Sequence, residues 1–95
     1  MAHHCHALGC GVPCKPAMLM HRAHWAMVPA ALKRRLYAAY VPGQERRMDP
    51  SPAYLRAAME CVIAVAKKEG YPEETVRAAP EVDGYRAWAE MLEGS

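Results

Sequence analysis

Residues 5–24 read CHALGCGVPCKPAMLMHRAH and contain most of the cysteines and histidines of this chain. Cys5 and Cys10 are separated by four residues, and His21 and His24 are separated by two. Ten residues that include Gly and Pro lie between the two pairs. Thiolate and imidazole are the ligands that zinc prefers, and two close pairs joined by such a loop are typical of a tetrahedral zinc site. The spacing therefore predicts a zinc site at this end of the chain.

The two pairs belong to different predicted local structures. Gly9 and Gly11 let the backbone wrap around a metal ion, because glycine tolerates conformations that other residues avoid. His21 and His24 are three residues apart at a predicted helix start, so they project to one side of that helix. Four protein ligands close the coordination sphere, which favours a structural zinc ion over a catalytic one.

Other side chains compete for the metal in this interpretation. Cys14 is the main alternative ligand, and three further histidines lie near by: His3, His4 and His6. Cys61 is set apart beside Val62 in an apolar segment, where we expect a buried residue of the core. Free thiols and surface histidines without a metal are the remaining alternative.

A metal would compensate for a core that is poor in large aliphatic residues. The chain has 95 residues, which fits one small domain, and 53% of them are hydrophobic. Ala supplies 18 of these residues, whereas Leu, Ile, Val and Phe together supply only 14. Small domains with so thin a core often depend on a metal, a disulfide or a partner. Metal binding stabilises zinc-finger peptides by about 10–16 kcal/mol, which is large beside the stability of a small domain.

Most of the remaining sequence has the periodicity of amphipathic helices. We predict helical segments at residues 21–28, at 29–40, at 51–70, at 73–78 and from residue 83 onward. In the second segment the expected buried stripe is formed by Leu32, Leu36, Tyr37 and Tyr40. Residues 1–20 are expected to form turns and loops, with a short hairpin around Val12 and Met18–Met20 as one option.

Residues 51–70 form the clearest predicted helix. Ser51 is expected to cap its N-terminus, Pro52 suits its first position, and Gly70 is expected to end it. The expected buried positions of this helix are Leu55, Met59, Val62 and Ala66. For the last helix we expect Asp83 as the cap, followed by one shared face formed by Tyr85, Trp88 and Leu92.

The predicted fold is therefore mainly α, with an N-terminal zinc knuckle followed by three to four helices in one small domain. We divide residues 1–95 into a zinc-binding module (1–28), a helical body (29–70) and an acidic C-terminal helical segment (71–95). The longest apolar run, Cys61–Ala66, is too short to span a bilayer, and the N-terminus lacks the apolar stretch of a signal peptide. We expect a cytoplasmic protein with no membrane partner and with reduced thiols.

The net charge of +2 conceals a basic half and an acidic half. Residues 1–47 hold seven basic residues and one acidic residue, whereas residues 48–95 hold five basic and nine acidic residues. The basic residues that we expect to contact nucleic-acid phosphates or a partner are Arg22, Lys33, Arg34, Arg35, Arg46 and Arg47. The alternatives are a solvated helix face for these side chains and two halves that pack together and compensate each other's charge.

The zinc-site residues continue into a longer pattern. His24-Trp25 is followed by a predicted helix and then by Tyr40-Val41-Pro42-Gly43-Gln44. Together with Cys5 and Cys10, this resembles a group of small, uncharacterised zinc-finger-like proteins of bacteriophages and prophages, whose pattern is C-x4-C-x10-C-x2-H-W followed by a helix and Y-x-P-G-Q. The resemblance covers roughly residues 5–60. This chain departs from the pattern by having His21 in place of the third Cys.

The resemblance implies a phage or prophage origin, a bacterial host cytoplasm and Cys5, Cys10, His21 and His24 as the ligands. It implies no established catalytic activity, and the sequence lacks the H-E-x-x-H and H-x-E…P-C-x-x-C patterns of zinc enzymes. We therefore expect a non-enzymatic accessory protein, without a small-molecule substrate, that binds nucleic acid or a nucleic-acid-handling host complex. The alternative is an inhibitor of a host complex, for example an anti-CRISPR or other anti-defence protein, acting through its acidic or basic face.

Overall fold

The computed structural model describes residues 4–15, 18–42 and 50–94. In these parts of the chain the backbone forms five helices: α1 (Arg22–Trp25), α2 (Ala30–Ala39), α4 (Pro52–Lys68), α5 (Glu73–Ala78) and α6 (Pro80–Glu93). The radius of gyration of 12.7 Å is close to the roughly 12 Å expected for a compact domain of this length. The predicted mainly α class is confirmed, with two of the five helices being very short.

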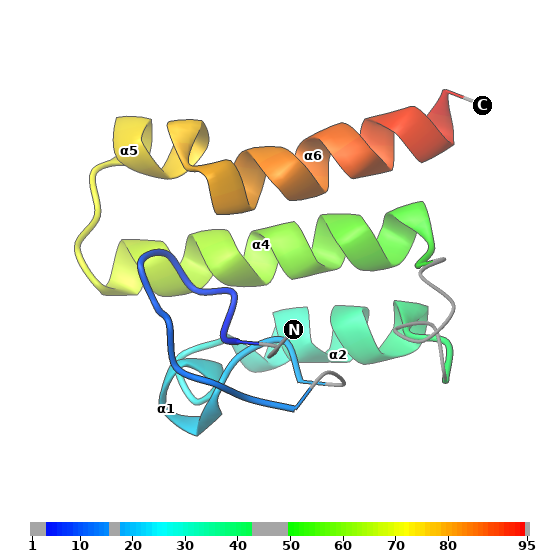
Figure 1. Cartoon of the computed structure of the whole chain (residues 1–95). Coiled ribbons are helices and arrows are strands. Elements are labelled where there is room, and N and C mark those ends of the chain that lie inside the picture. The colour runs from blue at the N-terminus through cyan, green and yellow to red at the C-terminus, as the bar shows by residue number, and fades with distance from the viewer. Residues whose placement is uncertain (1–3, 16–17, 43–49, 95) are drawn as a thin grey trace.

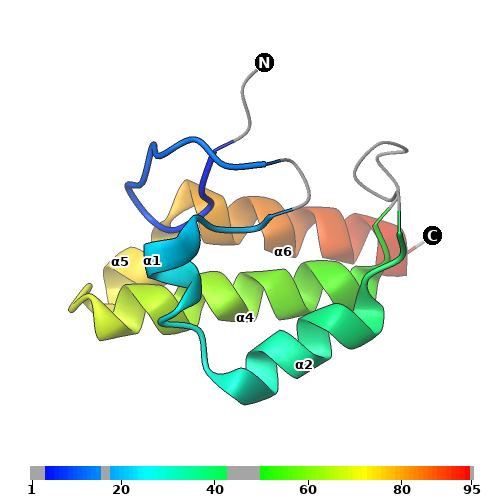
Figure 2. The ribbon, with the colours of Figure 1, turned by 90° about the horizontal axis from the view of Figure 1, so that it is seen from below.

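Helix α4 is the centre of the fold. It packs against α6 on one side and against α2 on the other, and it runs antiparallel to both (Figure 1). Helix α5 precedes α6 in the same layer. The N-terminal segment and α1 lie beside the C-terminal end of α4, as both views show (Figure 2). This end of α4 is therefore the place where the predicted zinc-binding module meets the helical body.

The N-terminus of α4 follows the prediction. The Ser51 hydroxyl accepts a hydrogen bond from the backbone N–H of Tyr54 at 3.1 Å, and Pro52 occupies the first turn. The helix has 17 residues, and none of the helices in the described part of the chain is both long and apolar enough to cross a bilayer. Its buried side chains are Leu55, Ala57, Ala58, Cys61, Val62, Val65 and Ala66.

The C-terminus of α4 is closed by a Schellman motif. Gly70 adopts a φ of +89°, a left-handed conformation that favours glycine. The N–H of Tyr71 donates to the carbonyl of Ala66, and the N–H of Gly70 donates to that of Lys67, both at 3.1 Å. The predicted stop at Gly70 is confirmed, and the motif turns Glu69 and Tyr71 towards the N-terminal segment.

Two predictions about the flanking helices are wrong. Tyr37 was expected in the buried stripe of α2, but 63% of its surface is exposed, whereas Leu36 is buried. Neighbouring residues point about 100° apart around a helix, and the face that α2 turns to α4 is covered at Leu36. Helix α6 begins at Pro80, so Asp83 lies inside the first turn instead of capping it.

Helix α6 also contributes side chains to the core. Its buried residues are Val82 and Ala89, and Tyr85 lies half-buried between them. Leu92 was expected to share a face with Tyr85 and Trp88, which are half-buried, but Leu92 itself is 36% exposed. Leu92 lies in the last turn, only two residues before the C-cap Gly94, near the end of the helix.

The N-terminal segment contains one isolated antiparallel bridge, between His4 and Pro13, and no longer strand among the described residues. The N–H of Cys5 donates to the Val12 carbonyl at 2.8 Å, and the N–H of His6 donates to the Leu19 carbonyl at 3.0 Å. In place of the optional short hairpin around Val12 and Met18–Met20, the described residues show residues 4–6 bonded to both of these stretches, with one isolated bridge and no continuous strand pair.

Candidate metal centre

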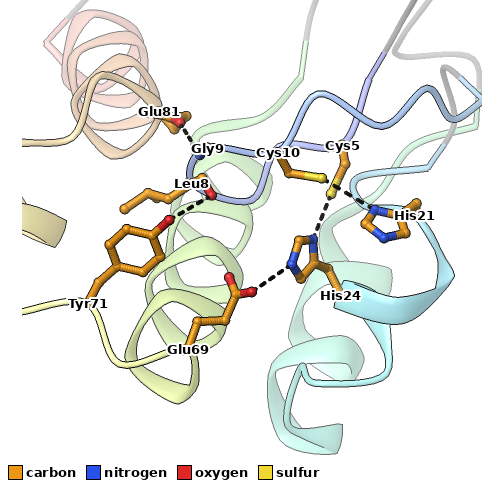
Figure 3. Close-up of polar contacts among 9 residues, drawn as sticks. All are labelled: Cys5, Leu8, Gly9, Cys10, His21, His24, Glu69, Tyr71 and Glu81. Carbon is orange, nitrogen blue, oxygen red and sulfur yellow. Dashed lines mark hydrogen bonds and ion pairs between the residues drawn. The ribbon is translucent and has the colours of Figure 1, made fainter.

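The structure brings the four predicted ligands together. One ligand atom from each of Cys5, Cys10, His21 and His24 lies within 4.8 Å of the other three. The distance from Cys5 Sγ to His24 Nδ1 is 3.4 Å, and that from Cys10 Sγ to His21 Nδ1 is 3.6 Å (Figure 3). In a tetrahedral zinc site, Zn–S and Zn–N bonds of about 2.3 and 2.0 Å place sulfur and nitrogen about 3.5 Å apart. The group could hold a metal ion, and its donor set suits zinc.

The two cysteines lie on either side of a tight turn. The N–H of Cys10 donates to the Ala7 carbonyl at 3.1 Å, and Gly9 within the turn has a φ of +70°. The pKa of the Cys5 thiol is raised above its ordinary value, mainly by burial, although the backbone N–H groups of Ala7 and His21 offset part of this rise. Such N–H donors stabilise a thiolate, which is the form that binds a metal.

The two histidines come from the start of α1. His21 is the N-cap residue of this helix, and His24 follows one turn later. Their rings meet edge to face, with centroids 4.7 Å apart. The i, i+3 spacing therefore puts both rings on one side of α1, and the Nδ1 atom of each faces a thiol.

Glu69 braces one of these histidines from the far side. Its Oε2 lies 3.0 Å from Nε2 of His24, and both side chains are largely shielded, with 29% and 15% exposure respectively. A carboxylate at this position keeps the proton on Nε2 and leaves the Nδ1 lone pair facing Cys5. Metal-binding histidines usually have such a partner on the other ring nitrogen. Glu69 therefore contacts one ring nitrogen of His24, while the other ring nitrogen faces Cys5.

Glu69 was not predicted as a residue of this site; in the sequence it is one of the nine acidic residues of the acidic half. The residue is the C-cap of α4 and lies 45 positions after His24. The one local signal in the sequence was that Glu69 stands just before Gly70, the residue at which the helix was predicted to end. That signal does not identify the partner, because the partner depends on how α1 packs against α4.

Two further contacts fasten the turn to the helical body. The N–H of Gly9 donates to Oε2 of Glu81 in α6 at 3.2 Å, and the hydroxyl of Tyr71 donates to the Leu8 carbonyl at 3.5 Å (Figure 3). A Cβ atom on Gly9 would lie 3.3 Å from the Tyr71 oxygen. The close approach and the positive φ both explain why glycine occupies this position.

His6 is used by the fold and is not part of the ligand group. Its Nδ1 is hydrogen-bonded to the hydroxyl of Tyr85 in α6. Burial raises the pKa of Tyr85, so its hydroxyl remains a neutral hydrogen-bonding group. Both residues line an open pocket of about 380 Å³ that borders Cys5 and Cys10 on the α6 side.

The alternative ligand Cys14 lies outside the ligand group. Its thiol is directed at the carbonyl of Met18, at 3.6 Å, and burial raises its pKa. His4 is exposed and His6 contacts Tyr85, while His3 lies outside the described residues. Among the described Cys and His residues, the predicted set of four is thus the set that converges.

The predicted basic surface is only partly available. Arg22 and Arg34 are exposed, on α1 and α2 respectively. Lys33 Nζ lies 5.1 Å from the centroid of the Trp25 ring, and Arg35 forms an ion pair with Glu60 of α4. Arg46 and Arg47 lie outside the described residues.

The acidic segment is partly consumed by internal contacts. Three of its carboxylates form ion pairs with arginines of the same half of the chain, and Glu81 accepts a hydrogen bond from the N–H of Gly9. The two halves of opposite charge contact each other through this bond, through the His24–Glu69 contact and through the Arg35–Glu60 ion pair. Comparison of the chain with protein-family models, with curated proteins and with solved structures finds no match.

Proposed function

We propose that this protein is a zinc-stabilised, non-enzymatic binding protein whose partner is nucleic acid or a complex that handles nucleic acid. The observation that carries the proposal is the convergence of Cys5, Cys10, His21 and His24 within 4.8 Å, braced by Glu69. Two thiolates and two imidazoles fill all four positions of a tetrahedral ion and leave none for a substrate. Such a site stabilises a fold and does not carry out a reaction.

The metal would join two separate segments of the chain. The thiolates come from the turn at residues 5–10, and the imidazoles come from α1. The same cluster reaches the helical body through Glu69 at the end of α4. Zinc bound here would therefore hold the N-terminal segment and α1 in a defined position on the body. The cytoplasm, where thiols stay reduced, is the compartment in which such a site persists.

The charge of the metal-binding region supports an anionic partner. Residues 1–44 contain no Asp or Glu at all. In the described part of this region, Arg22 and Arg34 are exposed and no ion pair is recorded for either. Phosphate contacts by such residues supply sequence-independent affinity for nucleic acid. The acidic residues, in contrast, are partly committed to internal contacts, which weakens the alternative of an inhibitor that acts through its acidic face.

Metal analysis combined with native mass spectrometry tests the first half of the proposal. We expect one zinc ion per chain, lost on chelation together with part of the helical circular dichroism. The variant Cys14→Ser is the matched control, because it removes a thiol of the same segment that lies outside the cluster, and it should keep the metal. A metal-free protein whose helicity does not respond to chelator would overturn the structural zinc site.

A salt titration tests the second half. Binding to short DNA and RNA oligonucleotides should weaken steeply with rising salt, and replacing Arg22 and Arg34 by Gln should lower the slope of log K against log salt. If the protein is not retained on any nucleic acid at low salt but captures one protein in stoichiometric amount from a bacterial lysate, the nucleic-acid proposal fails. That result would support the inhibitor of a host complex instead.

A further inference from the structure

An aromatic pocket that contains none of the four candidate ligands lies between residues 18–20, α1, α2 and the start of α4. Its volume is about 240 Å³, and its walls include Trp25, Tyr37, Tyr40 and Tyr54. The whole chain has only seven aromatic residues of the Phe, Trp and Tyr type, so most of them gather here. Pockets for drug-sized ligands usually exceed roughly 300 Å³, so this one suits a single planar ring system.

Tyr37 is the exposed wall of this pocket. It is 63% exposed, although the helical periodicity predicted a buried position. Its ring packs edge to face against Trp25, with centroids 6.0 Å apart and an interplanar angle of 70°. Trp25 is in turn covered by the ammonium group of Lys33 at 5.1 Å. The Tyr37 ring is thus held by its contact with Trp25, while most of its surface is open to solvent.

The charges beside this ring are positive. Lys33 and Arg34 precede Tyr37 by four and three residues on α2, so both lie next to it on the helix surface. Arg34 is exposed, and no ion pair is recorded for it. Arg35 is held by Glu60 and points elsewhere. An exposed aromatic ring flanked by cations is the combination that binds unpaired bases and their phosphates.

We infer that this pocket receives an unpaired base of single-stranded nucleic acid, which stacks on Tyr37 while the exposed Arg34 contacts an adjoining phosphate. The inference rests on the proposed function and narrows it to a nucleic-acid form and a site. Single strands are favoured over duplexes, because a base that is paired and stacked in a duplex cannot offer its face to a side chain. An aromatic face accepts every base, so we expect little sequence preference.

Fluorescence anisotropy with a labelled ten-nucleotide dT strand at low salt, and with a duplex of the same length, tests this site. The variant Tyr37→Ala should weaken binding to the single strand by about tenfold, the scale of one base–aromatic stack, and leave duplex binding unchanged. Tyr37→Phe keeps the ring and should bind like the unaltered protein. Met91→Ala is the matched control, because Met91 on α6 has the same 63% exposure. Circular dichroism should show that all three variants keep their helices.

The outcomes separate the site from the function. If Tyr37→Ala binds the dT strand as tightly as the unaltered protein, while Arg22→Gln with Arg34→Gln weakens binding, the pocket assignment is wrong and the nucleic-acid proposal stands. If the unaltered protein binds neither oligonucleotide, both the base-binding site and direct nucleic-acid binding fail, and a nucleic-acid-handling complex is the partner that remains in the proposed function. A protein partner whose capture depends on Tyr37 would likewise overturn the base-binding site and identify the pocket as a protein-docking surface.

Discussion

Along α4 and α6 the buried side chains repeat at helical spacing, whereas residues 4–28 contain one helix of only four residues. The first region buries mainly Ala, Val and Leu between two antiparallel helices. The second region does bury Cys5, Leu8 and Met20, but its backbone follows turns and makes few regular hydrogen bonds. It also contains four side chains that could hold a metal ion, and it contacts α4 and α6 through Glu69 and Glu81.

The difference shows how a chain with few large aliphatic residues can still form one fold. Apolar burial contributes about 25 cal/mol per Å², so it stabilises the helix pair through many small contributions that no single residue dominates. A metal site concentrates its contribution at four residues. Substitutions in the two regions should therefore differ in how much stability they remove and in how much of the structure they affect.

The largest effect is expected from removing a ligand. Cys5→Ser or Cys10→Ser should abolish metal binding and remove up to roughly 10 kcal/mol of apparent stabilisation from the N-terminal segment. Hydrogen exchange should then show loss of amide protection in residues 4–28, while α4 keeps more of its protection. Cys14→Ser should change neither quantity. Uniform loss of protection across α4 and α6 would instead show that the two regions are not separable.

The next effect concerns a buried thiol of the helical body. Burial raises the pKa of Cys61 from its ordinary 9.0 to about 11, and the negative charge of Glu60 adds to the rise. The folded state therefore holds this proton more tightly than the unfolded state. The associated stability is complete below pH 9 and is lost as the pH rises towards 11, by roughly 3 kcal/mol.

Urea unfolding between pH 8 and 11 measures this loss for Cys61. The variant Cys61→Ala leaves a small cavity and should be less stable than the unaltered protein below pH 9, but its stability should fall less as the pH rises. Equal slopes for the two proteins would contradict the assignment of the pH dependence to Cys61.

Glu69 tests the connection between the two regions. Glu69→Gln should weaken metal affinity about 10- to 100-fold, because residues that orient a metal-binding histidine usually contribute on this scale. Glu74→Gln makes the same change of charge at an exposed position in α5 and serves as the control. Competition with a chelator of known affinity gives both values. Equal affinities for the two variants would reduce Glu69 to a surface contact.

The smallest effects are expected from two glycines, Gly70 at the end of α4 and Gly84 inside α6. Gly70→Ala should destabilise the protein by about 1–2 kcal/mol, because a φ of +89° is unfavourable for alanine although no atom obstructs its Cβ. Gly84→Ala lies inside α6 with open space around its Cβ and should stabilise the protein by about 0.5–1 kcal/mol. Thermal unfolding measures both. The same sign for both variants would refute the assignment of their effects to backbone conformation.

Local rules were enough for several features. The cap at Ser51, the stop at Gly70 and the burial of Cys61 each depend on a few neighbouring residues, and the structure confirms all three. The four candidate ligands were recognisable because metal ligation requires particular side chains at short spacings. The occupation of the site by zinc and the resemblance to phage proteins stay predictions.

Tertiary packing decided the rest. The spacing of residues in α2 could not show that Tyr37 would be exposed, because that depends on which neighbour covers each face of the helix. The roles of Glu69 and Glu81 depend on where the ends of α4 and α6 lie relative to residues 9 and 24. A carboxylate on an exposed helix end looks the same in the sequence whether it faces water or a histidine. Only the packing of the N-terminal segment against the end of α4 distinguishes the two.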